Sequence, residues 1–215
     1  MTPTSAFSRC RPSSARPLHR WYRPFAGILA AVAIAAGLPS FAQASYAERE
    51  DARAFATEIA SRHALDAGEI ERALAGARHD PEVIRLITPP ARKGARSWRS
   101  YRARFLDRTR IDGGLRFWRE HTDTLARAER ETGVPAEVIV AIIGVETIYG
   151  RNTGNFETLS TLATLAFDYP PRAELFRREL EALFLLAREQ GRDPASYYGS
   201  FAGALGYPQF LPSSM

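Results

Sequence analysis

The stretch from Pro135 to Tyr149 places the strongest constraint on the fold, because it is apolar on nearly every face of a helix. A helix of this kind is buried on all sides, so the chain must supply several packing partners. Pro135 suits the first turn of such a helix. Apolar residues recur at helical spacing elsewhere too, in the segments 48–64, 66–77, 80–89, 115–133, 158–167 and 175–191. With no convincing strand pattern, these segments predict an all-α protein.

One carboxylate, Glu146, lies near the C-terminal end of the apolar stretch. On a helix it shares a face with Ile139, Ile142 and Ile143. Burial among isoleucines disfavours the ionised form of a carboxyl group, so we expect Glu146 to keep its proton readily enough to act as a general acid. Two ordinary alternatives stay open. Glu146 is either paired with Arg151 or is a helix-end residue that reaches water.

The first 44 residues have the composition of a secretory signal peptide. Five arginines precede an apolar run from Phe25 to Leu38, and small residues lead from there to Ala44. The run is short for a bilayer span, which leaves a retained membrane anchor as the alternative. Cys10 is the only cysteine and none stands at the predicted cleavage site to accept a lipid. We therefore expect export to the periplasm without an N-terminal lipid anchor.

The formal net charge of +5 comes from the predicted signal peptide, which holds five of the 29 basic residues and no acidic one. The rest of the chain has 24 of each sign, so its charge indicates no nucleic-acid partner. A local basic region from Arg92 to Arg110 contains Trp98, Tyr101 and Phe105. We expect a solvated helix whose aromatic side chains turn inward. The alternative is contact with an anionic polymer of the cell envelope.

The segment from Tyr198 to Ser214 is rich in Gly, Ser and aromatic residues. Small residues allow backbones to approach closely. Aromatic rings beside hydroxyl and amide groups suit a sugar-binding site, because rings stack on sugars while polar groups bind their substituents. The alternative is the start of a helix that packs on a neighbour through a tight turn.

Several motifs, in order along nearly the whole chain after the signal peptide, resemble the membrane-bound lytic murein transglycosylase B family. They are Gly144-Val145-Glu146-Thr147, Tyr149-Gly150-Arg151, Ser200-Phe201-Ala202-Gly203-Ala204, and Gly206-Tyr207 through Gln209-Phe210 to Pro212-Ser213-Ser214. The resemblance implies a lysozyme-like helical catalytic domain that cleaves the MurNAc–GlcNAc β-1,4 bond of peptidoglycan without a metal or organic cofactor. The expected organisation is a signal peptide (1–44), an N-terminal helical segment (45–90) and a catalytic domain (91–215).

The resemblance also implies roles for individual residues. Glu146 would protonate the glycosidic oxygen and then take the proton from the MurNAc O6, which closes onto C1 as 1,6-anhydroMurNAc. One residue then acts as both acid and base, without the second carboxylate of most glycosidases. Ser200 would hydrogen-bond the acetamido group, Tyr207 and Gln209 would line the glycan cleft, and Arg172 would meet stem-peptide carboxylates.

The sequence departs from the family pattern at three places. Pro208 stands where the family usually has Gly, and Pro171 replaces the first residue of a commonly Arg-Arg pair. Family members continue beyond the position of Met215, with a Tyr-Asn motif of the cleft and, in some, a calcium loop, so the sequence is expected to be truncated.

Three functions remain open after these departures: a lytic transglycosylase, a lysozyme-type muramidase that uses water in place of O6, and an inactive peptidoglycan-binding remnant. In each case we expect a monomer that binds peptidoglycan glycan strands. No nucleic-acid partner is expected, and association with the membrane or with cell-wall synthases is left open.

Overall fold

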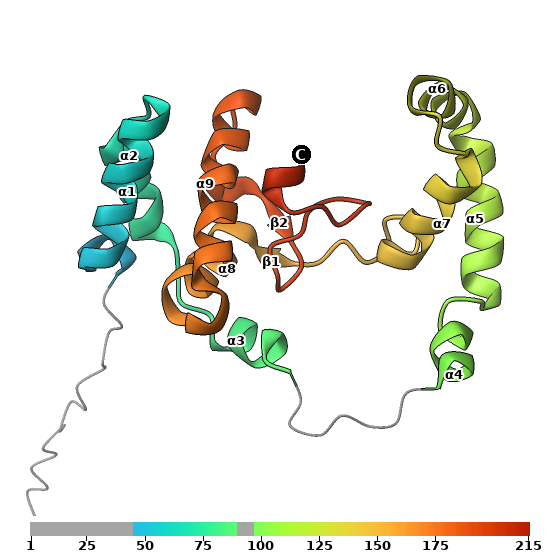
Figure 1. The fold of residues 1–215 in the computed structure, drawn as a ribbon, viewed down its shortest axis with the longest axis horizontal. Coiled ribbons are helices and arrows are strands. Elements are labelled where there is room, and N and C mark those ends of the chain that lie inside the picture. Colours follow the sequence, from blue (N-terminus) through green and yellow to red (C-terminus); the bar gives the residue numbers. More distant parts are fainter. Residues whose placement is uncertain (1–44, 90–96) are drawn as a thin grey trace, which may run out of the picture. The chain divides into compact units, whose positions relative to one another are not determined.

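The computed structural model describes residues 45–89 and 97–215. The predicted signal peptide and the predicted boundary at residue 90 lie outside the described residues. The α-helices in Figure 1 are α1 (Glu50–His63), α2 (Ala67–Gly76), α3 (Pro81–Ile87), α4 (Trp98–Ala103), α5 (Arg108–Glu120), α6 (Thr122–Thr132), α7 (Ala136–Thr147), α8 (Thr158–Asp168) and α9 (Ala173–Gln190). Short 3₁₀ helices are η1 (Tyr46–Glu48), η2 (Pro170–Arg172), η3 (Pro194–Ser196) and η4 (Pro212–Ser214). The all-α prediction is confirmed.

Helix ends follow the sequence signals closely. The carboxylate of Asp66 accepts a hydrogen bond from the Glu69 amide (3.0 Å) at the start of α2, and Asp80 caps α3 in the same way. Gly133 ends α6 in the left-handed region, with φ 72°. The single helix predicted to end there is instead two helices, α5 and α6, with a break at His121. At that break the Thr122 hydroxyl bonds the carbonyls of the preceding turn, which competes with the helical backbone pattern.

Two strands interrupt the helices, where the sequence predicted none. β1 (Phe156–Glu157) and β2 (Tyr198–Gly199) pair antiparallel, with Phe156 opposite Gly199. Each strand has two residues, which is too short to give the alternation that marks a strand in a sequence.

The larger hydrophobic core surrounds α8, where every residue from Thr158 to Phe167 is buried. α8 packs most extensively against α9, and α2 and α3 also contact it. Its fully buried side chains include Leu159, Leu162 and Leu165, which meet Leu180 and Leu183 of α9 within one cluster. The helix that is buried on all sides is therefore α8, although the sequence pointed to the stretch 135–149.

α7 is buried on one face only. Its buried residues are Ala136, Val140, Gly144 and Thr147, and a second, smaller core joins α7 to α5 and α6. The opposite face is exposed, with Val138 at 42%, Ile142 at 46% and Val145 at 43% of their full accessibility. The prediction of burial all round is wrong because the described helices cover a single face of α7.

Two of the three aromatic residues of the basic region do not turn inward as predicted, while Phe105 is half-buried. Trp98 is 71% exposed and Tyr101 is 51% exposed, and their rings stack with centroids 5.9 Å apart. α4, which carries both, has no buried residue, so no core lies against this helix to bury their rings. The part of this region before residue 97 lies outside the described residues.

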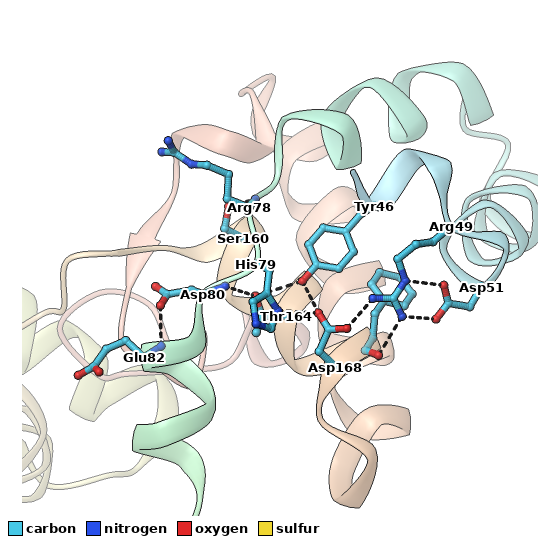
Figure 2. A network of polar contacts seen from close by, with 11 residues as sticks. Tyr46, Arg49, Asp51, Arg78, His79, Asp80, Glu82, Ser160, Thr164 and Asp168 are labelled. Carbon is cyan, nitrogen blue, oxygen red and sulfur yellow. Dashed lines mark hydrogen bonds and ion pairs between the residues drawn. The ribbon is translucent and has the colours of Figure 1, made fainter. Parts of the chain in front are cut away.

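A polar network centred on Asp168 joins the N-terminal end of the described chain to α8 (Figure 2). The Asp168 carboxylate accepts hydrogen bonds from the Tyr46 hydroxyl (2.6 Å) and the Arg49 guanidinium, and it contacts His79 Nδ1 at 2.9 Å. Burial alone would raise the pKa of Asp168, but these three partners outweigh it and hold that pKa below its usual value. Burial also raises the pKa of Tyr46, with a further contribution from its bond to Asp168.

Two buried hydroxyl groups of α8 extend this network to the segment before α3. Ser160 accepts a hydrogen bond from the Arg78 amide (2.9 Å), and Thr164 accepts one from the Asp80 amide (3.0 Å). These bonds satisfy amide groups that would otherwise be unpaired at a helix surface. No helix in the two described ranges is long and apolar enough to cross a membrane.

Candidate active site at the end of α7

Glu146 lies in the last turn of α7 and is exposed. It is on the open side of the helix with Ile142 and Val145, so the burial expected for its carboxylate is absent. The alternative pairing with Arg151 is not formed either, since the ion pairs between described residues do not include Glu146. Of the three interpretations, the helix-end carboxylate that reaches water describes the structure. The Glu146 carboxylate is therefore open to solvent among the described residues.

Tyr207 and Gln209 lie on a tight turn that faces the end of α7. Leu205 and Phe210 form the base of this turn through reciprocal backbone hydrogen bonds of 2.7 and 3.2 Å, and residues 206–209 form its tip. The tip is joined to α7 by a hydrogen bond of 2.9 Å from the Thr147 hydroxyl to the Tyr207 carbonyl. The residue next to Glu146 in sequence therefore contacts the tip directly.

The two tip side chains differ in their freedom. Tyr207 is 47% exposed, and its ring lies 6.3 Å from that of Phe117, centroid to centroid. Gln209 has φ 53°, and its side-chain amide donates to the carbonyls of Thr153 (3.1 Å) and Gly206 (2.9 Å). The Gln209 side chain thus holds the tip in shape, while the Tyr207 ring presents a partly open face to solvent.

Ser200 opens the preceding turn, directly after β2. Its hydroxyl oxygen accepts from the amides of Ala202 (3.3 Å) and Ala204 (3.1 Å). A hydroxyl has one proton to donate and two lone pairs, so both acceptor positions serve the turn, and the hydroxyl proton has no acceptor in the hydrogen bonds between described residues. Gly203 has φ 78° and packs on Leu162 of the main core, so close backbone approach is confirmed. No helix begins between Ser200 and Phe210.

A buried carboxylate anchors the end of this segment from the side of α9. Glu179 is only 4% exposed, and its two oxygens accept from the Ser213 amide (3.0 Å) and the Ser213 hydroxyl (2.8 Å). None of the sequence motifs indicated Glu179. Its signal was its spacing, three positions after Phe176 and four before Leu183, which puts a charged residue on the apolar face of α9.

A cavity of about 210 Å³ lies between α5, the end of α7 and the tip. Its lining includes the rings of Phe117, Tyr149 and Tyr207 and the side chain of Arg151. Burial raises the pKa of the Tyr149 hydroxyl above its usual value, against the opposing effect of the Arg110 charge. A larger cavity of about 580 Å³, between α2 and the C-terminal end of α9, is lined by none of the predicted site residues.

Arg172 does not join the other predicted site residues. It is exposed at the start of α9, with its guanidinium 5.3 Å from the centre of the Phe176 ring. No hydrogen bond or ion pair among the described residues connects it to Glu146 or to the tip. Across the same residues, no group of three or more His, Cys, Asp or Glu is placed to hold a metal ion.

The chain matches the family described as Transglycosylase SLT domain over residues 47–215. It is 40% identical over 178 residues to membrane-bound lytic murein transglycosylase B of Escherichia coli K12, which covers 79% of this chain and 49% of the relative. The chain therefore spans about half the length of that protein.

Two solved structures extend the comparison. The catenated lytic transglycosylase SltB1 of Pseudomonas aeruginosa is 44% identical, with a TM-score of 0.76 over 79% of this chain and 55% of that one. SltB3 of the same organism, solved with NAG-NAM-pentapeptide, is 30% identical, with a TM-score of 0.68 over 77% of this chain and 44% of that one. These likenesses confirm the predicted lysozyme-like helical fold. The chain belongs to the family of transglycosylase SLT domains, as its resemblance to membrane-bound lytic murein transglycosylase B predicted.

Proposed function

We propose that this chain is a lytic transglycosylase that cleaves the MurNAc–GlcNAc β-1,4 bond of peptidoglycan and forms a 1,6-anhydroMurNAc end. The observation that carries the proposal is an exposed carboxylate, Glu146, on a helix end that is hydrogen-bonded to an aromatic- and amide-bearing turn. Family membership over residues 47–215 supports the same chemistry. SltB3 has been solved with NAG-anhNAM-pentapeptide as well, and such an anhydro sugar is the product expected here.

In the proposed mechanism Glu146 acts first as a general acid. Its carboxyl proton goes to the glycosidic oxygen, the bond from that oxygen to C1 of MurNAc breaks, and GlcNAc leaves with a new hydroxyl group. The positive charge that develops at C1 is stabilised by the acetamido group of the same sugar. A glycan seated over the open face of α7 would exclude water from the carboxyl group, beside the apolar side chains of Ile142 and Val145.

Glu146 then acts as a general base. Its carboxylate takes the proton from the MurNAc O6, and the oxygen bonds to C1 to close the 1,6-anhydro ring. The carboxyl group regains its proton, so no water is consumed and the residue returns to its starting state.

The remaining predicted residues would bind the substrate or shape the turn that binds it. The hydroxyl proton of Ser200 would be donated to the acetamido carbonyl, since both acceptor positions of Ser200 already bind backbone amides. The exposed ring of Tyr207 would stack on a sugar face, and Gln209 would keep the turn in shape. Arg172, exposed at the start of α9, would meet a stem-peptide carboxylate away from the bond that breaks.

We further propose that the chain is exported through its N-terminal segment and acts as a monomer on periplasmic peptidoglycan. The arginine-rich start, the apolar run and the small residues before Ser45 support export.

The products of digestion test the proposed function. The full chain is incubated with purified sacculi in water labelled with the heavy oxygen isotope, and the released muropeptides are analysed by mass spectrometry. Anhydro ends that are one water lighter than reducing ends and carry no label are expected. Labelled reducing ends would show a muramidase that uses water instead of O6. Binding to sacculi without release of fragments would show a binding protein, and either result would overturn the proposal.

A further inference from the structure

Thr147 is the buried residue closest in sequence to the proposed catalytic carboxylate. It has 0% exposure, and its hydroxyl lies 2.9 Å from the Tyr207 carbonyl and 3.3 Å from the Ile143 carbonyl. The same oxygen accepts a hydrogen bond of 3.0 Å from the Gly150 amide. A hydroxyl has one proton to donate, and the shorter distance favours Tyr207 as its acceptor. The Thr147 hydroxyl is thus the point where the helix end and the tip meet.

The backbone after Thr147 is in an unfavourable conformation. Ile148 and Tyr149 have φ values of 52° and 59°, so two successive residues with side chains occupy the left-handed region. This region is rare for a β-branched residue such as Ile148, and such conformations persist only where the surroundings hold them. Thr147 contributes twice to holding it, through the bond from Gly150 to its hydroxyl and the bond from the Asn152 amide to its carbonyl (2.9 Å).

The Tyr149 ring supplies the other support for this helix end. A Cβ atom built on Gly113 would lie 2.9 Å from the Tyr149 ring, and one on Gly114 would lie 2.6 Å from its hydroxyl. Gly144 faces the same hydroxyl, and the Phe117 ring centre is 5.5 Å from that of Tyr149. Three glycines therefore form a socket for this ring, which we call the glycine socket. With the ring fixed there, the end of α7 has a defined direction.

The Glu146 side chain takes part in none of the hydrogen bonds or ion pairs between described residues, so none of these fixes its distance from the tip. Among the described residues, the bond from Thr147 to Tyr207 is the hydrogen bond that joins α7 to residues 205–210. We propose that Thr147 is a positioning residue, whose hydroxyl holds the tip with Tyr207 and Gln209 in register with the Glu146 carboxylate. This inference rests on the proposed function, because it assumes that Glu146 and the tip act on one glycan.

Two conservative substitutions of Thr147 separate the role of its hydroxyl group from the role of its shape. Thr147→Val keeps the shape of the side chain but removes the hydroxyl, which leaves the Tyr207 carbonyl and the Gly150 amide without their partner. Thr147→Ser keeps the hydroxyl and removes a methyl group. Thr158→Val is the matched control, because Thr158 is also fully buried and its hydroxyl has no partner within the described part of the chain.

The test compares the full chain with these three variants. For Thr147→Val we expect kcat for glycan cleavage to fall by about 10²-fold, the size of effect that a small misplacement causes, with a smaller change in KM. Thr147→Ser should recover most of this loss, and Thr158→Val should match the unsubstituted chain. Amide hydrogen exchange, followed by NMR, should speed up at Gly150 in Thr147→Val and not in Thr147→Ser. Thermal unfolding identifies any variant that fails to fold.

The outcomes separate this inference from the proposed function. An active unsubstituted chain with equally active Thr147→Val would overturn the positioning role, whatever the exchange rate at Gly150. A folded Thr147→Ser as impaired as Thr147→Val would also overturn it, because the hydroxyl would not be the group that matters. An unsubstituted chain without turnover would instead overturn the proposed function itself, and the exchange rate at Gly150 would then report only whether the hydrogen bond exists.

Discussion

At the scale of single residues, Glu146 illustrates how position on a helix decides what a carboxylate can do. The sequence placed it among isoleucines, and in the structure those neighbours divide between two faces, with Ile142 exposed and Ile143 partly buried. Glu146 lies on the open side. In the proposed mechanism its acidity therefore depends on the substrate that covers that face, rather than on burial by the protein's own core.

Glu146→Gln should abolish glycan cleavage and leave folding unchanged. The amide is too weak an acid to protonate the glycosidic oxygen and too weak a base to take the proton from O6, so both steps of the proposed mechanism fail. Because the side chain is exposed, the free energy of unfolding should change by no more than about 0.5 kcal/mol. Sacculus digestion and thermal unfolding measure the two effects.

The control for this substitution is Glu137→Gln, which changes an exposed carboxylate in the first turn of the same helix. It should keep full activity. A Glu146→Gln variant that still releases muropeptides at the normal rate would assign the acid and base roles to another group.

Asp168 gives the molecule a stabilising contribution that depends on pH. Its pKa in the folded chain is below the usual value of about 3.9, so the folded state releases the proton more easily than the unfolded state. The contribution is therefore present above about pH 4 and is lost as the pH falls through the lower pKa of the folded chain. Asp168→Asn should reduce stability at pH 7 and make little difference in stronger acid.

Urea unfolding at pH 7 and at about pH 2 to 3, below the usual pKa of an aspartate, measures this dependence. The stability difference between the unsubstituted chain and Asp168→Asn should shrink in acid. Asp112→Asn, at an exposed position of α5, should show no comparable difference at either pH. A difference for Asp168→Asn that stays constant with pH would contradict the role given to its hydrogen bonds.

At the scale of the elements, the glycine socket predicts an effect of Gly144→Ala on stability that is opposite to the one expected from helix propensity. Alanine favours a helix over glycine by up to about 1 kcal/mol, yet a methyl group on Gly144 would meet the Tyr149 hydroxyl. Gly144→Ala should therefore destabilise the fold by about 1–3 kcal/mol, the usual cost of overpacking, and also lower activity by displacing the end of α7. Gly76→Ala in α2, where nothing lies within 4 Å of the new atom, should be neutral or stabilising. Chemical unfolding of both variants gives the comparison, and equal effects would mean that the socket can yield.

The elements also show which features a sequence can reveal. Helix starts at Asp66 and Asp80 and the ending at Gly133 were predictable, because each depends on a local side-chain or backbone preference. The break at His121 and the pairing of β1 with β2 were not. The break depends on a hydroxyl that competes with the helix backbone, and the strands depend on partners more than 40 residues apart in the sequence.

For the candidate site, too, the sequence indicated the residues but not the contact that joins two of its elements. The motifs identified Glu146, Ser200, Tyr207 and Gln209, but sequence alone did not indicate that Thr147 joins α7 to the tip. Such a contact depends on the path of the chain between residues 147 and 207, which no local pattern records.

At the scale of the whole molecule, two helices have similar apolar sequences and very different surroundings. α8 is buried along its length by α2, α3 and α9, whereas α7 has α5 and α6 on one face. Hydrophobic periodicity measures how much burial a helix can accept, and tertiary packing decides how much it receives. For that reason the helical periodicity correctly predicted an all-α protein but indicated α7, rather than α8, as the helix that is buried on all sides.

The two cores should differ in local stability. The core around α8 and α9 contains many fully buried side chains, while the one that α7 shares with α5 and α6 has Phe117, Leu125, Ala136 and Val140 as its buried members. Local opening is easiest where few apolar side chains are buried. Amide hydrogen exchange should therefore be slowest in α8 and α9 and markedly faster in α5, α6 and α7.

Leu180→Ala and Leu125→Ala extend this prediction to variants. Leu180→Ala, in the larger core, should speed exchange mainly in α8 and α9, because these helices exchange through global unfolding, whose free energy it lowers by about 2–5 kcal/mol. Leu125→Ala should act mainly on α5, α6 and α7, where opening does not require the larger core to unfold. Equal protection of α7 and α8 in the unsubstituted chain, or a uniform response to Leu125→Ala, would show that the two cores open as a single unit.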